Sequence, residues 1–437
     1  MRLFSELERS ILKPGQNAIL PALLILGGTC LMLPFGMLHA YGCVPWFLTG
    51  AGLMVTGYFW SLREKSIPVW IFWGVTVGVR FLLLWQVPGD DIFRYIWEGR
   101  ILLAGFNPYL HSPDASVLES LRGGVWDAVQ YKSFTAIYPP LAEWLFAGFS
   151  GVLPVPLFFK SVFAAADLCT VFLLVRAFGK PAALLYAWNP LVIYSFAGGG
   201  HFDGIFVLAL VCGWLAWRKE KILSAALWIG GAIAIKWIAL PLLAWMLWTT
   251  LWQRGWKSAL PSAFSAVLPF LVSWSAVGIW TGEWTTQLLP PMFSEYARSA
   301  EFLPAIVGWF WDESRYENHL FILPLAIVWT IVIVRARSFE IAAQWIFFFA
   351  LVLTPMLHGW YFTWIIPFAV LTRNRGIIVL AASGFTYFLL YHHVESPGGI
   401  WRLSPVETAV LWLPFVAGFL WSEWRRLFPV SRRDIPR

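Results

Sequence analysis

An acidic pair, Asp90 and Asp91, opens the richest group of polar residues in the chain, the segment GDDIFRYIWEGRILLAGFNPYLHSPD at 89–114. On a helix that starts at Asp91, the side chains of Arg94 and Glu98 share a face with Asp91 because they follow it at helical spacing. A carboxylate in this position can act as a general base, since it can accept the proton of an attacking hydroxyl group. The alternative is an ordinary helix start, with acidic residues in the first turn and an ion pair between Asp91 and Arg94.

Single polar residues also interrupt apolar sequence farther along the chain. His201 and Asp203 follow three consecutive glycines, and Lys236 lies within the run IGGAIAIKWIALP. A charge inside an apolar run is costly, so each of these residues is a functional candidate. The alternatives are a flexible loop with ordinary polar residues after the glycines and a structural ion pair between Lys236 and Asp167.

These residue types suit the transfer of a group from a lipid-linked anion. A carboxylate can deprotonate the acceptor hydroxyl, and Arg94, Lys236 and His201 are candidates to bind the departing phosphate. Two adjacent acids can also bind a divalent cation, but adjacency alone is a weak signal, so no metal ligand or cofactor is predicted and the cation stays open. For the HGWY segment at 358–361 the alternative is an ordinary aromatic belt at the membrane interface. The remaining substrate-binding candidates are Glu98, Asn107, Tyr109, Tyr138, Trp188, Asp203, His358, Trp360 and Tyr361.

The composition defines the elements that must position these residues. Of the 437 residues, 59% are hydrophobic and 13% are charged, and the mean hydropathy is +0.68. Soluble domains are less apolar and about twice as highly charged, so the chain is predicted to be an all-α polytopic membrane protein. The formal net charge of +7 fits the cytoplasmic excess of Lys and Arg in membrane proteins and not a nucleic-acid partner. The four Cys show no CxxC spacing and are interpreted as small buried hydrophobic residues.

Apolar segments near the length of a membrane helix predict about 12 crossings and two broken or re-entrant elements. The broken elements are 140–158, which two prolines interrupt, and 222–251, which contains Lys236 and Pro241. This arrangement places the short basic clusters on the cytoplasmic side and the candidate residues on the external side, as the positive-inside rule requires. The crossings are expected near 17–40, 44–62, 67–87, 161–177, 181–197, 204–217, 259–280, 318–334, 340–357, 360–372, 376–391 and 403–421.

The whole chain, 1–437, is interpreted as a single transmembrane domain. Residues 88–138 are predicted to form a long external loop with an amphipathic interfacial helix. Residues 422–437 form a basic cytoplasmic tail, and the polar start at 1–16 is interpreted as a cytoplasmic segment without a cleavable signal.

The segment DIFRYIWEGRILLAGFNPY at 91–109, followed by YPPL at 138–141, resembles the first external loop of GT-C superfamily glycosyltransferases. The likeness is greatest to bacterial polyprenyl-phosphate-mannose-dependent mannosyltransferases and to the catalytic subunit of GPI mannosyltransferase I. Three later segments extend the resemblance to about residue 370: WNPLVIYSFAGGGHFDG (188–204), GGAIAIKWIALP (230–241) and HGWYFTWIIP (358–367).

The resemblance implies a GT-C-like fold in which Asp91 matches the loop aspartate taken as catalytic, with Asp90 as its acidic neighbour. The HFDG segment departs from the His-Asn-Asp of many bacterial relatives, so no role is carried over to its middle position. The other matched positions are Arg94, Asn107, Pro108, Tyr109, His201, Asp203 and Lys236.

The implied reaction is the inverting transfer of a hexose, with mannose favoured, from a polyprenyl-phosphate donor to a hydroxyl group of a lipid or glycan acceptor. The implied location is a bacterial plasma membrane, with the active site on the external, periplasmic face and the bilayer as a partner. A secondary transporter or lipid flippase with about 12 spans is the alternative, and a non-catalytic assembly subunit is a third. Transporters place their charges near the membrane midplane, whereas the acidic pair here precedes a long external loop, which favours the enzyme.

Overall fold

The computed structural model describes residues 18–286 and 297–427, so the predicted tail at 422–437 lies largely outside the described part. The described residues are mostly helical, and they contain an isolated bridge between Ser299 and Met356 but no β-strand. Five of the described helices are long and apolar enough to cross a membrane, and five shorter apolar helices accompany them. The all-α membrane fold is therefore confirmed, whereas the count of about 12 crossings stays a prediction.

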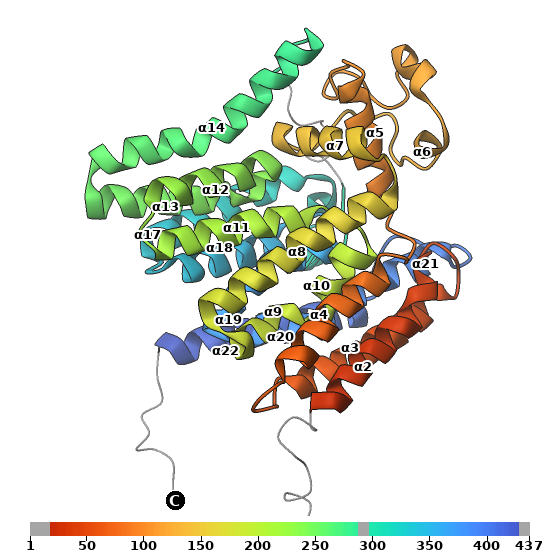
Figure 1. Ribbon diagram of the computed structural model, residues 1–437, viewed down its shortest axis with the longest axis vertical. Coiled ribbons are helices and arrows are strands. Elements are labelled where there is room, and N and C mark those ends of the chain that lie inside the picture. The colour runs from red at the N-terminus through yellow and green to blue at the C-terminus, as the bar shows by residue number, and fades with distance from the viewer. Residues whose placement is uncertain (1–17, 287–296, 428–437) are drawn as a thin grey trace, which may run out of the picture. The chain divides into compact units, whose positions relative to one another are not determined.

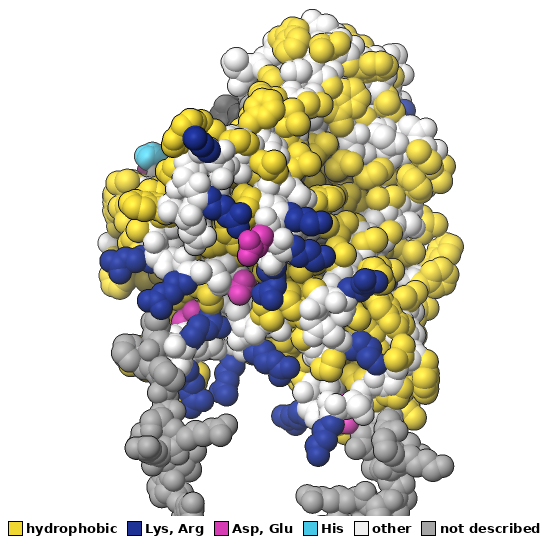
Figure 2. All heavy atoms as spheres, turned by 60° about the vertical axis from the view of Figure 1, so that its left-hand side comes forward, with side chains coloured by type: hydrophobic (Ala, Val, Ile, Leu, Met, Phe, Trp, Pro, Cys, Tyr) yellow, Lys and Arg dark blue, Asp and Glu magenta, His cyan; other side chains and the backbone are white. Residues whose placement is uncertain are grey.

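The outer surface is largely hydrophobic. Figure 2 shows one face on which apolar side chains cover much of the surface, with Lys and Arg gathered among few acidic residues. Large apolar side chains such as Phe264 and Ile279 on one helix and Leu323 on another are exposed. Soluble monomers rarely expose contiguous apolar surface of this kind, so the exposed side chains are those that a lipid bilayer would cover.

The chain divides into two compact units that interleave along the sequence (Figure 1). The first unit combines Met1–Val87, Leu174–Ser195 and His358–Arg437, and the second combines Pro88–Leu173 and Phe196–Leu357. The interpretation of 1–437 as one transmembrane domain stays a prediction.

The first unit contains the N-terminal helices and the last helices of the chain. Helices α3 and α4 both pack against α2, and α20 packs along α22. Its helices are α2 (Ile19–Met32), α3 (Cys43–Ser61), α4 (Val69–Leu83), α9 (Lys180–Ala187), α10 (Pro190–Ile193), α19 (Ala369–Thr372), α20 (Arg375–Ser383), α21 (Leu389–Glu395) and α22 (Pro405–Leu427), with 3-10 turns at Leu33–Phe35, Gly359–Trp364, Ile366–Phe368 and Gly384–Phe388.

Basic turns meet at one end of the first unit. The side-chain oxygen of Asn374 accepts the N–H of Gly376 at the start of α20, and its amide donates to Glu423 on α22. Arg426 donates to the same carboxylate at 2.8 Å. The α3–α4 loop and the start of α9 line one cavity together with Arg373. The basic turns that meet in this way are those around Lys65, Lys180, Arg373 and Arg426.

The predicted single span at 181–197 is interrupted in the structure. Helix α9 ends at Ala187, α10 begins at Pro190, and a π-helical turn follows at Tyr194–Gly198. The side-chain oxygen of Asn189 accepts the N–H of Leu191, which caps a new helix start. Pro190 has no N–H to continue the preceding helix, so the Asn-Pro pair forces the break.

The second unit contains the helix bundle that follows the loop at 88–138. Helix α12 packs against both α11 and α14, and α13 packs against α14 and α17. Its helices are α5 (Asp91–Leu103), α6 (Gly124–Asp127), α7 (Pro140–Val152), most of α8 (Pro156–Phe178), α11 (Asp203–Arg218), α12 (Ile222–Ile235), α13 (Leu240–Arg254), α14 (Trp256–Thr281), α16 (Leu303–Phe310), α17 (Ile322–Arg335) and α18 (Phe339–Leu353), with 3-10 turns at Ser116–Leu121, Trp237–Ala239, Asp312–Tyr316 and Asn318–Phe321.

The two ends of the second unit differ in charge. At one end Arg254 forms an ion pair with Glu220 at 3.0 Å, and Trp245 donates to the carbonyl of Ala336. The turns after α11, α13 and α17, all of which carry basic residues, therefore lie together. Helix α11 begins at Asp203 at its other end, about 24 Å away along a 16-residue helix. Within this unit the basic turns and the start of α11 therefore lie at opposite ends, and the membrane sidedness of the candidate residues stays a prediction.

Helix α5 is present as predicted, but its environment differs from that of an interfacial helix. Trp97 and Ile101 pack against Leu118 and Val129 of the same loop, so loop residues cover one side. The other side packs against α7, where a Cβ at Gly99 would lie 2.3 Å from the carbonyl oxygen of Phe146. The helix is therefore buried between its own loop and α7. Helix α7 has 13 residues and is too short to cross a membrane, as predicted for 140–158.

Candidate active site

Asp91 is the first residue of α5, and its carboxylate is partly accessible. Its side chain is 33% exposed, and Oδ2 lies 3.5 Å from Nδ1 of His201. The hydroxyl group of Tyr95, one turn later, donates to the same oxygen at 3.4 Å. Burial, together with the negative charge of Asp91, raises the pKa of Tyr95 well above its ordinary value. Tyr95 therefore stays a neutral donor to the carboxylate at neutral pH.

The glycine turn before α11 brings His201 to Asp91. The backbone N–H of Gly89 donates to the carbonyl of Gly199 at 2.9 Å, which ties this turn to the residues just before α5. Gly200 has a φ of +77°, and a Cβ there would lie 3.2 Å from Cγ of Lys160. A residue with a side chain would be strained in this conformation. The turn is therefore a packed structural element with a buried His201, and the flexible-loop interpretation is wrong.

Phe202 lies between His201 and Asp203 in the sequence, and its ring packs against α5. Its ring packs edge-on against Tyr95, Tyr138 and Phe146, with centroid distances of 5.1, 4.9 and 5.3 Å. Tyr95 also stacks on Phe146 of α7 at 4.8 Å. These rings fix the turn against α5 and α7.

Lys236 forms an ion pair with Asp203. The distance from Nζ to Oδ1 is 2.5 Å, the Asp203 side chain is fully buried, and that of Lys236 is 12% exposed. Lys236 lies where α12 ends, and its backbone is extended. Its ammonium group also lies 4.9 Å from the centroid of Phe202. On the sequence alone, the alternative to a functional role for Lys236 is an ion pair with Asp167. The structure contains an ion pair of Lys236, but the partner is Asp203.

Arg94 does not pair with Asp91, which corrects the expectation from helical spacing. Its Nε donates to Glu98 at 2.8 Å. Its terminal nitrogens donate to the carbonyl oxygens of residues 130, 131, 134 and 135. All of its donor nitrogens are thus used within the loop, so Arg94 shapes the loop and is not placed to bind a phosphate.

Glu98 lies beside a second buried acid, Glu143 on α7. Burial raises the pKa of Glu143 well above its ordinary value, and the negative charge of the neighbouring Glu98 raises it further. Burial also raises the pKa of Glu98, although Arg94 opposes the shift. Two buried carboxyl groups with one arginine are stable when one of them keeps a proton.

The polar residues at the end of α5 fix the shape of the loop. The amide of Asn107 donates to the carbonyl of Glu283, and the Asn107 side-chain oxygen accepts the N–H of Tyr109. The Tyr109 hydroxyl donates to the carbonyl of Tyr138 at 2.7 Å. These three candidates therefore shape the loop at 88–138 through backbone contacts.

Asp90 precedes α5 at the N-cap position, but its side chain makes no capping hydrogen bond. The backbone of Asp90 is already helical in φ and ψ, whereas a capping side chain needs an extended residue. A capping role for Asp90 is therefore excluded in this structure.

His358 and Tyr361 belong to the first unit. Nδ1 of His358 lies 2.8 Å from the hydroxyl of Tyr387, and the imidazole stacks on Trp360 at 4.6 Å. Trp188, also in this unit, is fully buried and donates to Thr76. Trp188 is therefore a packing residue and not an exposed platform for a sugar ring.

Two functional candidates were not found from the sequence. Glu143 stands in an apolar segment of the sequence. Only the structure shows that it is buried beside Glu98, which raises its pKa. Lys160 lies in the apolar run LFFKSVFAAAD and is buried beside Gly200. The rule that singled out Lys236, a charge in an apolar span, would also have identified Lys160.

No group of three or more His, Cys, Asp or Glu among the described residues is arranged to bind a metal ion. The candidate site is instead an acid–histidine pair, Asp91 and His201, with an adjoining Asp203–Lys236 pair and Lys160 beside the same turn.

An all-helical membrane protein with this acid–base cluster at one end of a helix bundle has the parts of a membrane glycosyltransferase. The chain belongs to the alpha-(1->6)-mannopyranosyltransferase family (MptA_B), whose N-terminal domain model matches residues 31–252, just over half of its length. It is therefore a mannosyltransferase of the GT-C type. The matched region contains the Asp91–His201 and Asp203–Lys236 pairs. No curated protein matches the chain.

Proposed function

We propose that this mannosyltransferase takes mannose from a polyprenyl-phosphate donor and transfers it, with inversion, to a hydroxyl group of a lipid or glycan acceptor. The observation that carries the proposal is the partly exposed carboxylate of Asp91, with His201 and Tyr95 beside it. An accessible carboxylate that accepts a hydrogen bond from a tyrosine and lies beside an imidazole can also accept the proton of a substrate hydroxyl.

In the proposed step, Asp91 accepts the proton of the acceptor hydroxyl while that oxygen attacks the anomeric carbon of mannose. The bond between this carbon and the phosphate oxygen breaks, and its electron pair leaves with the polyprenyl phosphate. A single displacement of this kind inverts the configuration at the anomeric carbon.

The leaving phosphate requires positive charge nearby. Lys236 pairs with Asp203 and keeps 12% of its side chain exposed, so its ammonium group is the first candidate to provide this charge. Lys160 lies beside Gly200 of the glycine turn and is the second candidate. Arg94 is no longer proposed to bind the phosphate, because its donors are already used within the loop.

The proposed location is the external face of a bacterial plasma membrane. It is supported by the charge distribution of the second unit, whose basic turns lie at the end opposite to Asp203. Basic turns favour the cytoplasmic side, so the opposite end favours the external side.

The test is an assay of purified protein in detergent with radiolabelled polyprenyl-phosphate mannose, polyprenyl-phosphate glucose and a nucleotide-linked mannose. The proposal expects consumption of the lipid-linked mannose alone, with a product of opposite anomeric configuration. Consumption of the nucleotide-linked sugar would contradict the donor assignment, and retention of configuration would contradict the single displacement.

A further inference from the structure

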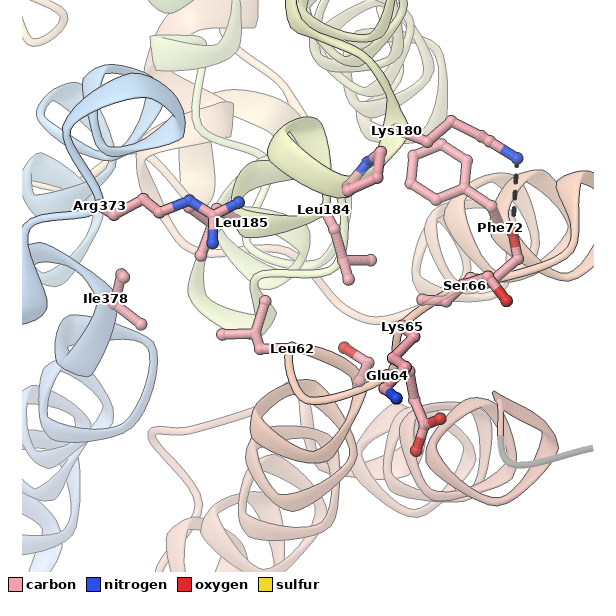
Figure 3. A pocket seen from close by; sticks show the side chains of 13 residues that line it. Leu62, Glu64, Lys65, Ser66, Phe72, Lys180, Leu184, Leu185, Arg373 and Ile378 are labelled. Carbon is pink, nitrogen blue, oxygen red and sulfur yellow. Dashed lines mark hydrogen bonds between the residues drawn. The ribbon is translucent and has the colours of Figure 1, made fainter. Parts of the chain in front are cut away.

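A cavity of about 370 Å³ lies within the first unit. It is lined by the α3–α4 loop, the start of α9 and the turn between α19 and α20 (Figure 3). Its polar lining consists mainly of three cations and one carboxylate: Lys65, Lys180, Arg373 and Glu64. Leu62, Phe72 and Leu184 contribute an apolar part of the same lining.

The positive charge of the cavity is not balanced within the described residues. Glu64 accepts a hydrogen bond from the indole of Trp60 at 3.2 Å, and no described carboxylate forms an ion pair with Lys65 or Arg373. Lys180 donates to the carbonyl of Ile67 at 3.4 Å (dashed in Figure 3). An ammonium group has three N–H donors, so Lys180 also retains donors for a ligand.

The backbone of Arg373, one of the lining cations, has an unusual conformation. This residue ends α19 with φ 50° and ψ 34°, the left-handed conformation that glycine usually adopts at a helix end. An arginine held in this conformation is strained, and such strain is a reason to look for a function. Figure 3 shows Arg373 among the side chains that line the cavity.

Two exposed tryptophans indicate where the cavity lies relative to a membrane. Trp60 at the end of α3 and Trp70 at the start of α4 flank the lining loop, with 40% and 72% of their surface exposed. Tryptophan is enriched at the level of the lipid head groups in membrane proteins. The cavity therefore combines cations at head-group level with an apolar wall, which matches an amphiphilic anion.

We propose that this cavity binds the phosphate group of an anionic membrane lipid. Arginine and lysine are the residues that recognise phosphate in proteins, arginine by paired hydrogen bonds and lysine as a point charge. The apolar part of the lining favours a lipid over a soluble phosphate compound, because a glycerol backbone and the first acyl carbons can pack on it. This site belongs to the first unit and is independent of the proposed transfer reaction.

The experiment measures binding of radiolabelled phosphatidylglycerol to the purified full-length protein in detergent micelles. The test variant carries Lys65→Gln and Arg373→Gln. The matched control carries Arg63→Gln and Arg375→Gln, which remove the same charge from exposed neighbours that do not line the cavity. The test variant should bind at least about tenfold more weakly, whereas the control should stay close to the wild type.

Unlabelled competitors distinguish the source of the phosphate. Phosphatidylglycerol should displace the label, and glycerol 3-phosphate, inorganic phosphate and zwitterionic phosphatidylcholine should not displace it at the same concentration. Equal losses in the two double variants would overturn the cavity assignment in favour of general surface charge. Displacement by glycerol 3-phosphate as effective as that by the lipid would overturn the lipid assignment. Unfolding temperatures of all variants show that the comparison is made on folded protein.

Discussion

Nζ of Lys236 lies 2.5 Å from Oδ1 of Asp203 and 4.9 Å from the ring centroid of Phe202, which packs against Tyr138 of the loop at 88–138. The pair joins the end of α12 to the start of α11 at the end of the second unit that lies opposite its basic turns. It therefore has a structural part and, under the proposed mechanism, a part in binding the donor phosphate.

These two parts can be separated by comparing single and double variants. Lys236→Met leaves the fully buried Asp203 without its cation, and loss of one partner of a buried ion pair costs about 3–5 kcal/mol of unfolding free energy. Lys236→Met combined with Asp203→Asn removes both charges and should recover most of that stability. The measurements are the unfolding temperature in detergent and the affinity for the lipid-linked donor.

The double variant should remain at least about tenfold weaker in donor binding, because a charge-assisted hydrogen bond to the phosphate is absent. Recovery of donor affinity together with stability would show that the pair is structural only.

Asp91 and Asp90 should respond differently to the same substitution. Asp91→Asn keeps the size of the side chain but cannot accept a proton, so transfer should fall by a factor of about 100 or more. Asp90→Asn should retain most of the activity, because the amide keeps the size of the side chain and no capping hydrogen bond is lost. The measurement is initial rate on two purified variants with matched unfolding temperatures. If only the Asp90 variant is inactive, the two roles must be exchanged.

The sequence predicts the elements of this site better than it predicts their contacts. The helix start at Asp91 and the short helix after Pro140 follow from local signals, and both are found. Helical spacing also suggested that Arg94 would pair with Asp91. The loop folds back so that the carbonyls at 130–135 surround the guanidinium, and a local pattern carries no information about such a return.

The same limit applies to partners that are distant in the chain. His201 lies more than one hundred residues after Asp91, and Glu143 lies more than forty residues after Glu98. Single charges in apolar runs identified His201, Asp203 and Lys236 as candidates, but the packing of Phe202 and the hydrogen bond from Gly89 to Gly199 bring them to α5. Glu143 had no such signal, because one acid in the first turn of a helix is ordinary.

Gly99 should tolerate no larger residue. A Cβ at this position would lie 2.3 Å from the carbonyl oxygen of Phe146, so Gly99→Ala must push α5 away from α7. Overpacking of this kind costs about 1–3 kcal/mol, and it also displaces Tyr95 from its stack on Phe146. The variant should therefore lower both the unfolding temperature and the transfer rate.

Gly148→Ala on α7 is the matched control, since a Cβ there would meet nothing within 4 Å. Alanine favours a helix over glycine by about 1 kcal/mol, so this variant should be neutral or slightly more stable. A Gly99→Ala protein as stable as the control would contradict the close contact of the two helices.

The Glu98–Glu143 pair should make stability depend on pH. Glu143 has a pKa raised well above its ordinary value of 4.5 by burial and by Glu98. Above 4.5 the unfolded chain releases a proton that the folded protein keeps, so the folded state binds more protons and stability falls as pH rises. The stabilising contribution is fully present below the ordinary value and is lost as pH rises through the raised pKa.

Glu143→Gln should remove this dependence, because the amide resembles the protonated acid and cannot lose a proton. The unfolding temperature of the wild type should therefore fall more steeply between pH 5 and 9 than that of Glu143→Gln, with the two differing most at the alkaline end. Glu119→Gln, which removes an exposed carboxylate from the loop at 88–138, should behave like the wild type. Parallel curves for the wild type and Glu143→Gln would mean that both acids are ionised in the folded protein and that Arg94 alone compensates them.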